Sequence, residues 1–352
     1  MSLISSNNRK IYKVLLFPLF TMSQIRLGLP KGSLNTVGRG NTAEIFANAG
    51  YELRGYEPGK ESDKKLAVVN DPEIIAFLCR PQSAPVELSR EMLDVAIVGE
   101  DWVREEAVNS NGAVRQIGDL EYGQTRLVIG VPRDAEYETL TEFFRANKGR
   151  QNPILAFTEY PNLTRQWVMQ NQGYKESFGE QVPLVQVRGL TDGNNRLVQI
   201  INSDGVTEGY MAKGADFIVD NTQTGSTLRE YGLRELETIM QSSSGLYAGP
   251  SCTGWKEEKA QEIFDMLKGA IVGKRYFDVK FNVPNADTER TREYLMEQGL
   301  CASEPSITTG QETSAFNILI PKCKFPDAVR TLRKDYNATA IAQQEARQYM
   351  ER

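Results

Sequence analysis

The residues with the clearest chemical potential lie in segment 215–233, which reads ADFIVDNTQTGSTLREYGL. A short apolar run leads through Asp220 into a turn rich in threonine, glycine and serine, and a helical pattern follows. Small hydroxyls and a glycine at the start of a helix can surround a phosphate, and an acid at the end of a strand can hold sugar hydroxyls. The pattern therefore suits a 5-phosphorylated ribose, although an N-capped helix after a buried strand explains it equally well. The candidate loop residues are Thr222, Gln223, Thr224, Gly225, Ser226 and Thr227.

A second candidate site lies in the segment LPKGSL, where the first predicted strand ends. Lys31 offers a mobile cation, and the neighbouring Gly32 has a backbone that can approach a ligand closely. A solvated lysine in a turn explains the segment as well. Asp101 follows another predicted strand, in the segment GED, where capping and helix-dipole effects favour an acid for structural reasons.

Three more charged residues stand beside predicted strands or turns. Arg80 and Arg126 flank strands and could each pair with a phosphate, but isolated arginines are usually surface residues. Glu208 lies in a glycine-bearing turn twelve positions before Asp220. Signals of this kind gain weight only when several of them accumulate.

The composition excludes several classes of site. The chain has 352 residues and a formal net charge of -5, which argues against a nucleic-acid-binding surface as its main role. It contains no histidine, so histidine general bases, Ser-His and Cys-His nucleophile pairs and histidine metal ligands are excluded. The four cysteines show no C-x-x-C spacing, which argues against a zinc site or a disulfide framework and favours a reducing cytoplasm.

The N-terminal segment is predicted to be a flexible leader. Residues 11–20 follow two basic residues and resemble a weak signal-peptide core, but Pro18 interrupts them and no A-x-A cleavage site follows. The apolar run is also too short to span a membrane. We therefore expect residues 1–21 to lie outside the fold.

The order of predicted elements indicates an α/β protein. The first series comprises strand 25–29, helix 42–49, strands 66–69 and 75–78, helix 86–92 and strand 95–98. The second comprises strand 127–131, helix 140–146, strand 154–158, helix 162–172, strand 184–187, helix 197–201 and strand 217–219. Two α/β lobes are the simplest arrangement of these series.

The last third of the chain differs in kind. A predicted strand pair, 237–241 and 245–247, precedes a long amphipathic helix over 255–272. The order then becomes strand 276–283, helix 288–298, strands 306–308 and 315–320, helix 327–334 and strand 338–341. This βαββαβ order predicts a ferredoxin-like unit.

Several motifs occur in one order, namely LGLPKGSL, DVAIVGEDWVREE, LEYGQTRLVIGVP, TEYPNL and GVTEGYMAKGADFIVDNTQTGSTLREYGLRE. In this order the chain resembles the long form of the ATP phosphoribosyltransferase family, which carries out the first step of histidine biosynthesis. The resemblance runs from about residue 24 to residue 334, and residues 220–233 are its most specific part. It implies two lobes of the type II periplasmic-binding-protein kind, followed by a ferredoxin-like regulatory domain.

The resemblance also implies a domain organisation and a set of partners. Lobe I is expected over 22–123 plus 241–274, lobe II with the phosphoribosyl-binding loop over 124–240, and the regulatory domain over 275–352. The expected state is a cytoplasmic homo-oligomer, a dimer or a hexamer, inhibited by free histidine. Neither nucleic acid nor a membrane is expected as a partner.

The reaction of the family implies roles for the candidate residues. Adenine N1 of ATP displaces pyrophosphate from phosphoribosyl pyrophosphate through an oxocarbenium-like state. Magnesium, carried mainly by the pyrophosphate, together with Lys31 and Arg126, would stabilise the departing charge, so no general base is assigned. By resemblance, Asp220 and the loop 222–227 hold the ribose and its 5-phosphate. The remaining implied substrate contacts are Lys31, Gly32, Arg80, Asp101 and Glu208.

Two departures from the family pattern and two rival functions stay open. Asn221 and Thr222 replace the usual aliphatic residues after the loop acid, and the tail ATAIAQQEARQYM lacks the usual Pro-Ile-Glu ending. The altered tail puts histidine inhibition in doubt more than catalysis. The alternatives are a solute-binding or sensing protein with the same lobes, and a prephenate dehydratase-like enzyme, although no T-x-R-[FY] motif occurs at a suitable place.

Overall fold

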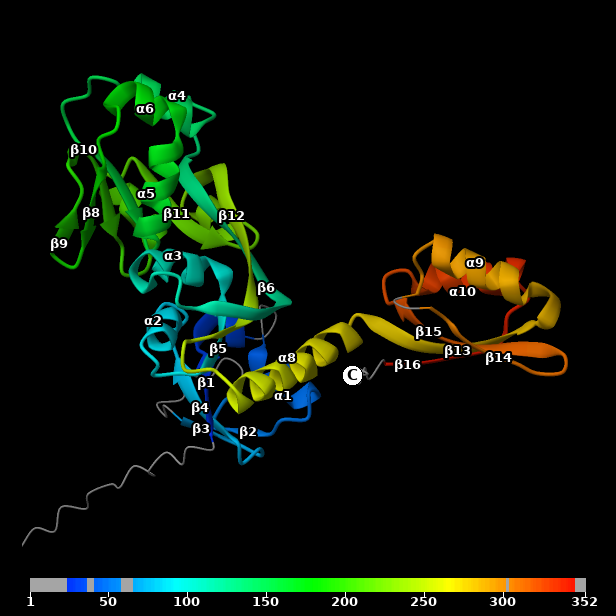
Figure 1. Cartoon of the computed structure of the whole chain (residues 1–352). Coiled ribbons are helices and arrows are strands. Elements are labelled where there is room, and N and C mark those ends of the chain that lie inside the picture. Colours follow the sequence, from blue (N-terminus) through cyan, green and yellow to red (C-terminus); the bar gives the residue numbers. More distant parts are fainter. Residues whose placement is uncertain (1–23, 37–40, 58–65, 302–303, 346–352) are drawn as a thin grey trace, which may run out of the picture.

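The computed structural model describes residues 24–36, 41–57, 66–301 and 304–345. The predicted leader lies outside these residues. Within them, the chain forms one twelve-stranded sheet and one four-stranded sheet (Figure 1). No helix of this described part is both long enough and apolar enough to cross a bilayer.

The large sheet is built from two α/β lobes joined by two long strands. Its strand order is β2-β3-β4-β1-β5-β12-β6-β11-β7-β10-β8-β9. Each lobe packs its own group of buried side chains around its strands, which confirms the predicted fold class. The first series of elements is β1 (Ile25–Pro30), the 3-10 helix η1 (Gly32–Asn35), α1 (Thr42–Asn48), β2 (Leu53–Arg54), β3 (Leu66–Val69), β4 (Ile74–Cys79), α2 (Ala84–Ser89), β5 (Val95–Gly99) and α3 (Glu100–Ser110).

The second series carries the chain through the other lobe and back. Strand β12 pairs antiparallel with β5 of the first lobe and with β6, which itself pairs antiparallel with β11 of the second lobe. These two strands therefore cross between the lobes. The elements are β6 (Arg115–Pro132), α4 (Leu140–Ala146), β7 (Ile154–Thr158), α5 (Pro161–Gln170), α6 (Gln172–Phe178), β8 (Pro183–Val187), β9 (Leu190–Asp192), β10 (Asn195–Asn202), the 3-10 helix η2 (Thr207–Lys213), β11 (Phe217–Thr222), α7 (Ser226–Glu230) and β12 (Leu233–Ala248).

Two predicted elements are wrong. Residues 197–201 form part of strand β10, not a helix, because this segment pairs in parallel with both β7 and β8 and buries Val198 and Ile200 completely. The predicted strand pair 237–241 and 245–247 is instead the single strand β12, which stays paired with β6 through several β-bulges. The structure also adds helix α6, where the sequence predicted only the end of the preceding helix.

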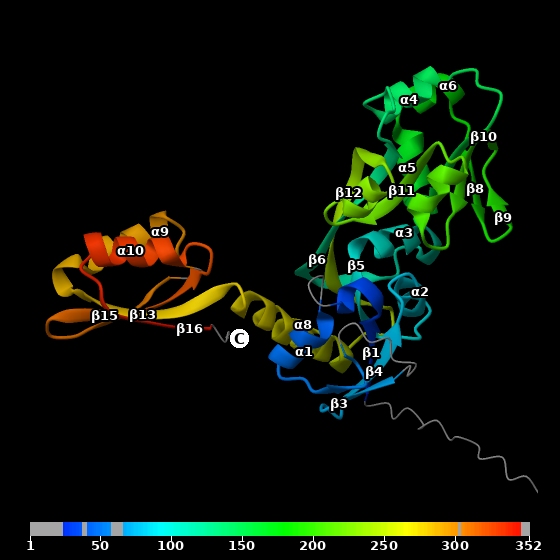
Figure 2. The same ribbon diagram turned by 180° about the vertical axis from the view of Figure 1, so that it is seen from behind.

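The C-terminal unit has the predicted ferredoxin-like order and stands apart from the lobes at the far end of α8, as Figures 1 and 2 both show. Its sheet order is β14-β15-β13-β16, and its two longer helices cover one face of the sheet. Arg275, just after α8, forms a 2.8 Å ion pair with Glu121 of β6. The proposed domain boundaries stay a prediction. The elements are α8 (Trp255–Gly273), β13 (Tyr276–Pro284), the 3-10 helix η3 (Asn285–Asp287), α9 (Thr288–Glu297), β14 (Ser306–Thr309), β15 (Thr313–Pro321), α10 (Phe325–Asp335) and β16 (Thr339–Glu345).

Candidate active site

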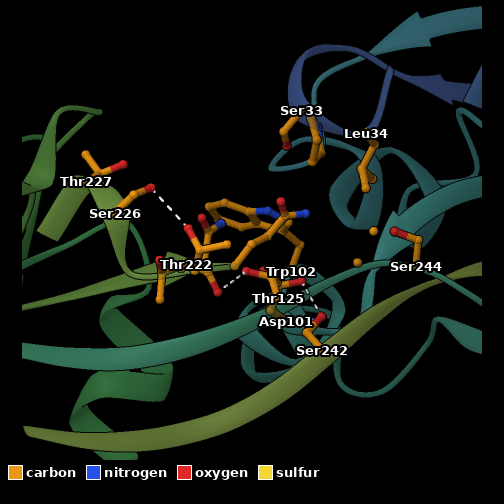
Figure 3. A pocket seen from close by; sticks show the side chains of 16 residues that line it. Ser33, Leu34, Asp101, Trp102, Thr125, Thr222, Ser226, Thr227, Ser242 and Ser244 are labelled. Atoms are coloured by element: carbon orange, nitrogen blue, oxygen red, sulfur yellow. Dashed lines mark hydrogen bonds between the residues drawn. The ribbon is translucent and has the colours of Figure 1, made fainter. Parts of the chain in front are cut away.

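A pocket of about 130 Å³ lies where the two lobes meet. The loop after β11 forms one side, and residues that follow β1 face it from the other lobe (Figure 3). The start of α3 and the crossing strands β6 and β12 complete the wall. Its lining residues are Ser33, Leu34, Pro81, Gly99, Asp101, Trp102, Gly123, Thr125, Asn221, Thr222, Gln223, Thr224, Ser226, Thr227, Ser242 and Ser244.

The predicted loop turns sharply between β11 and α7 because Gly225 adopts a left-handed conformation, with φ at +69°. The Gly225 N–H donates to Thr222 Oγ1 at 2.9 Å, and Thr224 Oγ1 donates to Ser226 Oγ at 3.1 Å. The loop therefore holds itself in a compact shape. The hydroxyl-bearing residues of the loop line the pocket, whereas Gly225 lies behind them.

Charged groups support the loop from behind. A Cβ atom on Gly225 would lie 2.7 Å from Glu235 Oε1 and 3.0 Å from Arg229 Nη1. Glu235 also accepts two hydrogen bonds from Arg126, at 2.5 and 2.9 Å, and this ion pair raises the pKa of the arginine. Arg126 lines a neighbouring hollow that shares Thr125 and other residues with the main pocket. This predicted phosphate-binding arginine is thus already held by a carboxylate.

Asp220 lies at the end of β11 among other acids. Burial raises the pKa of Asp220 to about 7, and the nearby Glu208 carboxylate adds to the effect by repulsion. Thr207 offers the Asp220 carboxyl group a hydrogen bond, and the Asn221 N–H donates to its Oδ1 at 2.7 Å. The structure therefore brings Asp220 and Glu208 near one another, although neither lines the pocket itself.

Three other predicted contacts, Lys31, Gly32 and Arg80, lie next to lining residues of the pocket. Lys31 and Gly32 immediately precede the lining residue Ser33, and Arg80 precedes the lining residue Pro81. Arg80 acts electrostatically on Glu159, whose carboxyl pKa is raised mainly by burial. Lys31 and Arg80 are therefore neighbours of lining residues, and their roles in binding stay predictions.

Asp101 lines the pocket, yet both of its carboxylate oxygens already accept hydrogen bonds from the protein. Tyr160 Oη donates to Asp101 Oδ2 at 2.7 Å, and Ser242 Oγ donates to Oδ1 at 2.8 Å. Burial raises the pKa of the Asp101 carboxyl group. Asn221 in turn donates to Tyr160 Oη at 2.7 Å, and Trp102 stacks on the Tyr160 ring at 4.2 Å. Asp101 thus connects the first lobe to the start of the predicted loop.

One turn further along α3, Glu105 forms a second connection between the lobes. The N-terminus of α5 receives no hydrogen bond from the side chain of its own N-cap, Tyr160. Instead, Glu105 accepts the backbone N–H groups of Asn162 and Leu163, each at 2.9 Å. Burial raises the pKa of the Glu105 carboxyl group to about 7, although these N–H groups act in the opposite direction. A helix of one lobe is therefore capped by an acid from the other.

Sequence reasoning missed most of the uncharged wall. Ser242 and Ser244 lie on β12, and Thr125 lies opposite Ser242 on β6. Weak signals existed for Ser33, which belongs to the segment LPKGSL, and for Trp102, which follows Asp101. No such sequence signal existed for Ser242 and Ser244, because only the pairing of two strands distant in sequence brings them to the pocket.

Comparisons with known proteins point to one family. Residues 80–269 match the family model described as ATP phosphoribosyltransferase. The chain is 30% identical over 272 residues to the ATP phosphoribosyltransferase of Pelotomaculum thermopropionicum, with 74% of this chain and 78% of the relative covered. It has the same identity and coverage with the enzyme of Desulforudis audaxviator.

Among solved structures, a chain of the ATP phosphoribosyl transferase (HisG:HisZ) complex from Thermotoga maritima is similar, with 22% identity and a TM-score of 0.48. The match covers 71% of this chain and 99% of that one. The sequence relatives and the family model, which spans more than half of the residues, decide the assignment. This chain belongs to the ATP phosphoribosyltransferase family.

Proposed function

We propose that the pocket between the lobes is where this chain joins its two substrates, with residues 220–227 holding the ribose 5-phosphate part of phosphoribosyl pyrophosphate. The family reaction transfers the phosphoribosyl group to N1 of the adenine of ATP, releasing pyrophosphate, in the first step of histidine biosynthesis. The observation that carries the proposal is the convergence of the hydroxyl-rich loop with residues of the other lobe around one pocket.

The expected chemistry is mainly positioning and electrostatics. As the bond to pyrophosphate breaks, positive charge develops on the sugar and negative charge on the leaving group. Asp220 would orient the sugar hydroxyls, whereas Lys31 would lie near the leaving group and stabilise its charge. Arg126 would contribute only by sharing its guanidinium between Glu235 and a phosphate group. No proton carrier is assigned.

Enzymes of this family generally need a metal ion. The described residues contain no group of three or more acidic or cysteine side chains arranged to hold one. We propose, as the family reaction implies, that magnesium enters as part of the substrate, bound to its pyrophosphate. Lys31, Gly32, Arg80 and Glu208 would then contact the substrate complex at the edge of the pocket.

The proposal also covers the location, the oligomeric state and the domain boundaries of the enzyme. We infer a cytoplasmic homo-oligomer, a dimer or a hexamer, with the domain boundaries given by the family pattern. Lobe I comprises 22–123 plus 241–274, lobe II comprises 124–240, and the regulatory domain begins at residue 275.

The Asp220→Asn variant should lose substrate binding while the fold survives. An amide accepts fewer hydrogen bonds than a carboxylate, so we expect the variant to lose about 1.5–3 kcal/mol of binding free energy for phosphoribosyl pyrophosphate. Its kcat/KM for this substrate should then fall roughly tenfold to 150-fold. Because the pKa of Asp220 is about 7 in the free protein, the wild-type kcat/KM should rise with pH through this range as the carboxylate forms. Steady-state kinetics between pH 6 and 8 would measure both effects.

The control is Asp192→Asn, which changes an exposed acid on β9. It should keep wild-type kinetics and the wild-type pH profile, whereas Asp220→Asn should lose the rise near pH 7. Unchanged Michaelis constants in the Asp220 variant would refute the assignment of this residue to the ribose.

Free histidine is proposed to act through the ferredoxin-like unit. Removing the chain from Arg275 onward should leave turnover by the lobes but abolish inhibition, because the effector would favour a less active subunit arrangement only through its own domain. The removal also deletes the Arg275–Glu121 ion pair, which is exposed and contributes little stability. Isothermal titration of histidine against the intact and truncated proteins would test this. Equal heats from both proteins would place the sensor elsewhere.

A further inference from the structure

The side chain of Ser244 is completely buried at the wall of the pocket. Among the described residues, its Oγ atom has no hydrogen-bond partner. The two preceding serines differ in this respect, since Ser242 donates to Asp101 and Ser243 donates to Asp119, each at 2.8 Å. In Figure 3 the Ser244 hydroxyl points into the pocket, on the side away from Ser226 and Thr227.

The backbone of Gly123 lies close to the Ser244 hydroxyl and places no side chain against it. Gly123 has a φ of +62°, and a Cβ atom there would lie 2.9 Å from Ser244 Oγ and 2.5 Å from Leu34 Cδ2. A larger residue at position 123 would therefore crowd both Leu34 and the Ser244 hydroxyl. A buried hydroxyl without a partner destabilises a folded protein, and an alanine of nearly the same size would avoid this cost. The arrangement is expected where a ligand supplies the missing partner.

We infer that Ser244 is a substrate contact, whose hydroxyl hydrogen-bonds a nitrogen or oxygen atom of ATP or of the pyrophosphate part of phosphoribosyl pyrophosphate. This inference rests on the proposed function, which places both substrates in this pocket. The 5-phosphate is not the partner, because the loop that would hold it lies across the pocket from Ser244 (Figure 3). The contact therefore belongs either to ATP or to the pyrophosphate end of phosphoribosyl pyrophosphate.

The test is the variant Ser244→Ala, with opposite effects expected on stability and on binding. The free variant should melt at the wild-type temperature or about 1–3 °C above it, because an unpaired polar atom is removed. Its KM for one of the two substrates should rise about fivefold to tenfold, since one hydrogen bond to the ligand is lost. Varying ATP and phosphoribosyl pyrophosphate separately identifies which substrate makes the contact.

The matched control is Ser243→Ala, one residue earlier on the same strand, whose hydroxyl is paired with Asp119. This control should leave both KM values unchanged. If Ser244→Ala also leaves both unchanged, the inference is wrong, whatever the variant's melting temperature. A second variant, Ser244→Cys, keeps a weak donor at the same position and should show an intermediate KM. If the wild-type protein itself shows no turnover of the two substrates, the proposed function is wrong.

Discussion

Replacing Glu105 with alanine should lower the free energy of unfolding of the paired lobes by about 2–4 kcal/mol, because two backbone N–H groups lose a carboxylate acceptor in a buried place. The groups are those of Asn162 and Leu163 at the start of α5, which has no side-chain cap of its own. Amide hydrogen exchange over residues 161–165 should become much faster. Activity should fall as well, because the N-cap of α5, Tyr160, also accepts a hydrogen bond from Asn221 next to the predicted phosphate loop.

The matched control for this prediction is Glu106→Ala, the next acid on the same helix. Glu106 accepts a hydrogen bond only from Asn109 of α3 among the described contacts, so its loss should leave exchange at α5 unchanged. Equal exchange in the two variants would show that Glu105 does not connect the lobes.

The pH dependence of stability gives a separate readout for Glu105. The pKa of its carboxyl group rises from 4.5 in the unfolded chain to about 7 in the fold, so the folded state binds the proton more tightly. The resulting stabilisation is fully present below pH 4.5 and is lost as the pH rises through 7. Glu105→Gln should therefore lose less stability than the wild type between pH 5 and 8, as thermal unfolding would show.

A valine at position 225 should reduce turnover by about a hundredfold or more, because it displaces the predicted phosphate loop by a sizeable part of an ångström. A β-branched side chain is strained at a φ of +69°, and its Cβ would lie 2.7 Å from Glu235 Oε1. The ion pair between Glu235 and Arg126 would have to move with the loop. Steady-state kinetics with both substrates would measure the loss.

Gly232→Val provides a control with matched backbone strain. Gly232 has a φ of +72°, and a Cβ atom there would have no neighbour within 4 Å. Its variant should be destabilised by strain alone while keeping most of its turnover. If both variants retain the same activity, Gly225 and its contact with Glu235 have no part in shaping the site.

The sequence predicted best those elements whose local pattern agrees with their place in the sheet. Residues 154–158 form β7 with the expected bounds, because the apolar run is short and buried in the second lobe. The strand, loop and helix around Asp220 were also predictable, since all three are adjacent in sequence. The βαββαβ unit followed from the order of its elements in the same way.

Elements decided by distant pairing could not be predicted. Leu197 and Ile201 have helical spacing, and only the neighbouring strands β7 and β8 determine that their segment is extended. The serines of β12 have little strand preference of their own, but pairing with β6 continues through them. Ser244 and Glu105 were missed for the same reason, because one gains its place from that pairing and the other from a helix of the opposite lobe.

The most direct test of the proposed reaction is pyrophosphate release by the purified chain, followed with a coupled phosphate assay in the presence of magnesium. We predict release that requires both ATP and phosphoribosyl pyrophosphate, and that falls roughly tenfold to 150-fold in kcat/KM when Asp220 is replaced by asparagine. Release that does not depend on ATP, or that is the same in the wild type and the Asp220→Asn variant, would contradict the proposed reaction and the role of Asp220.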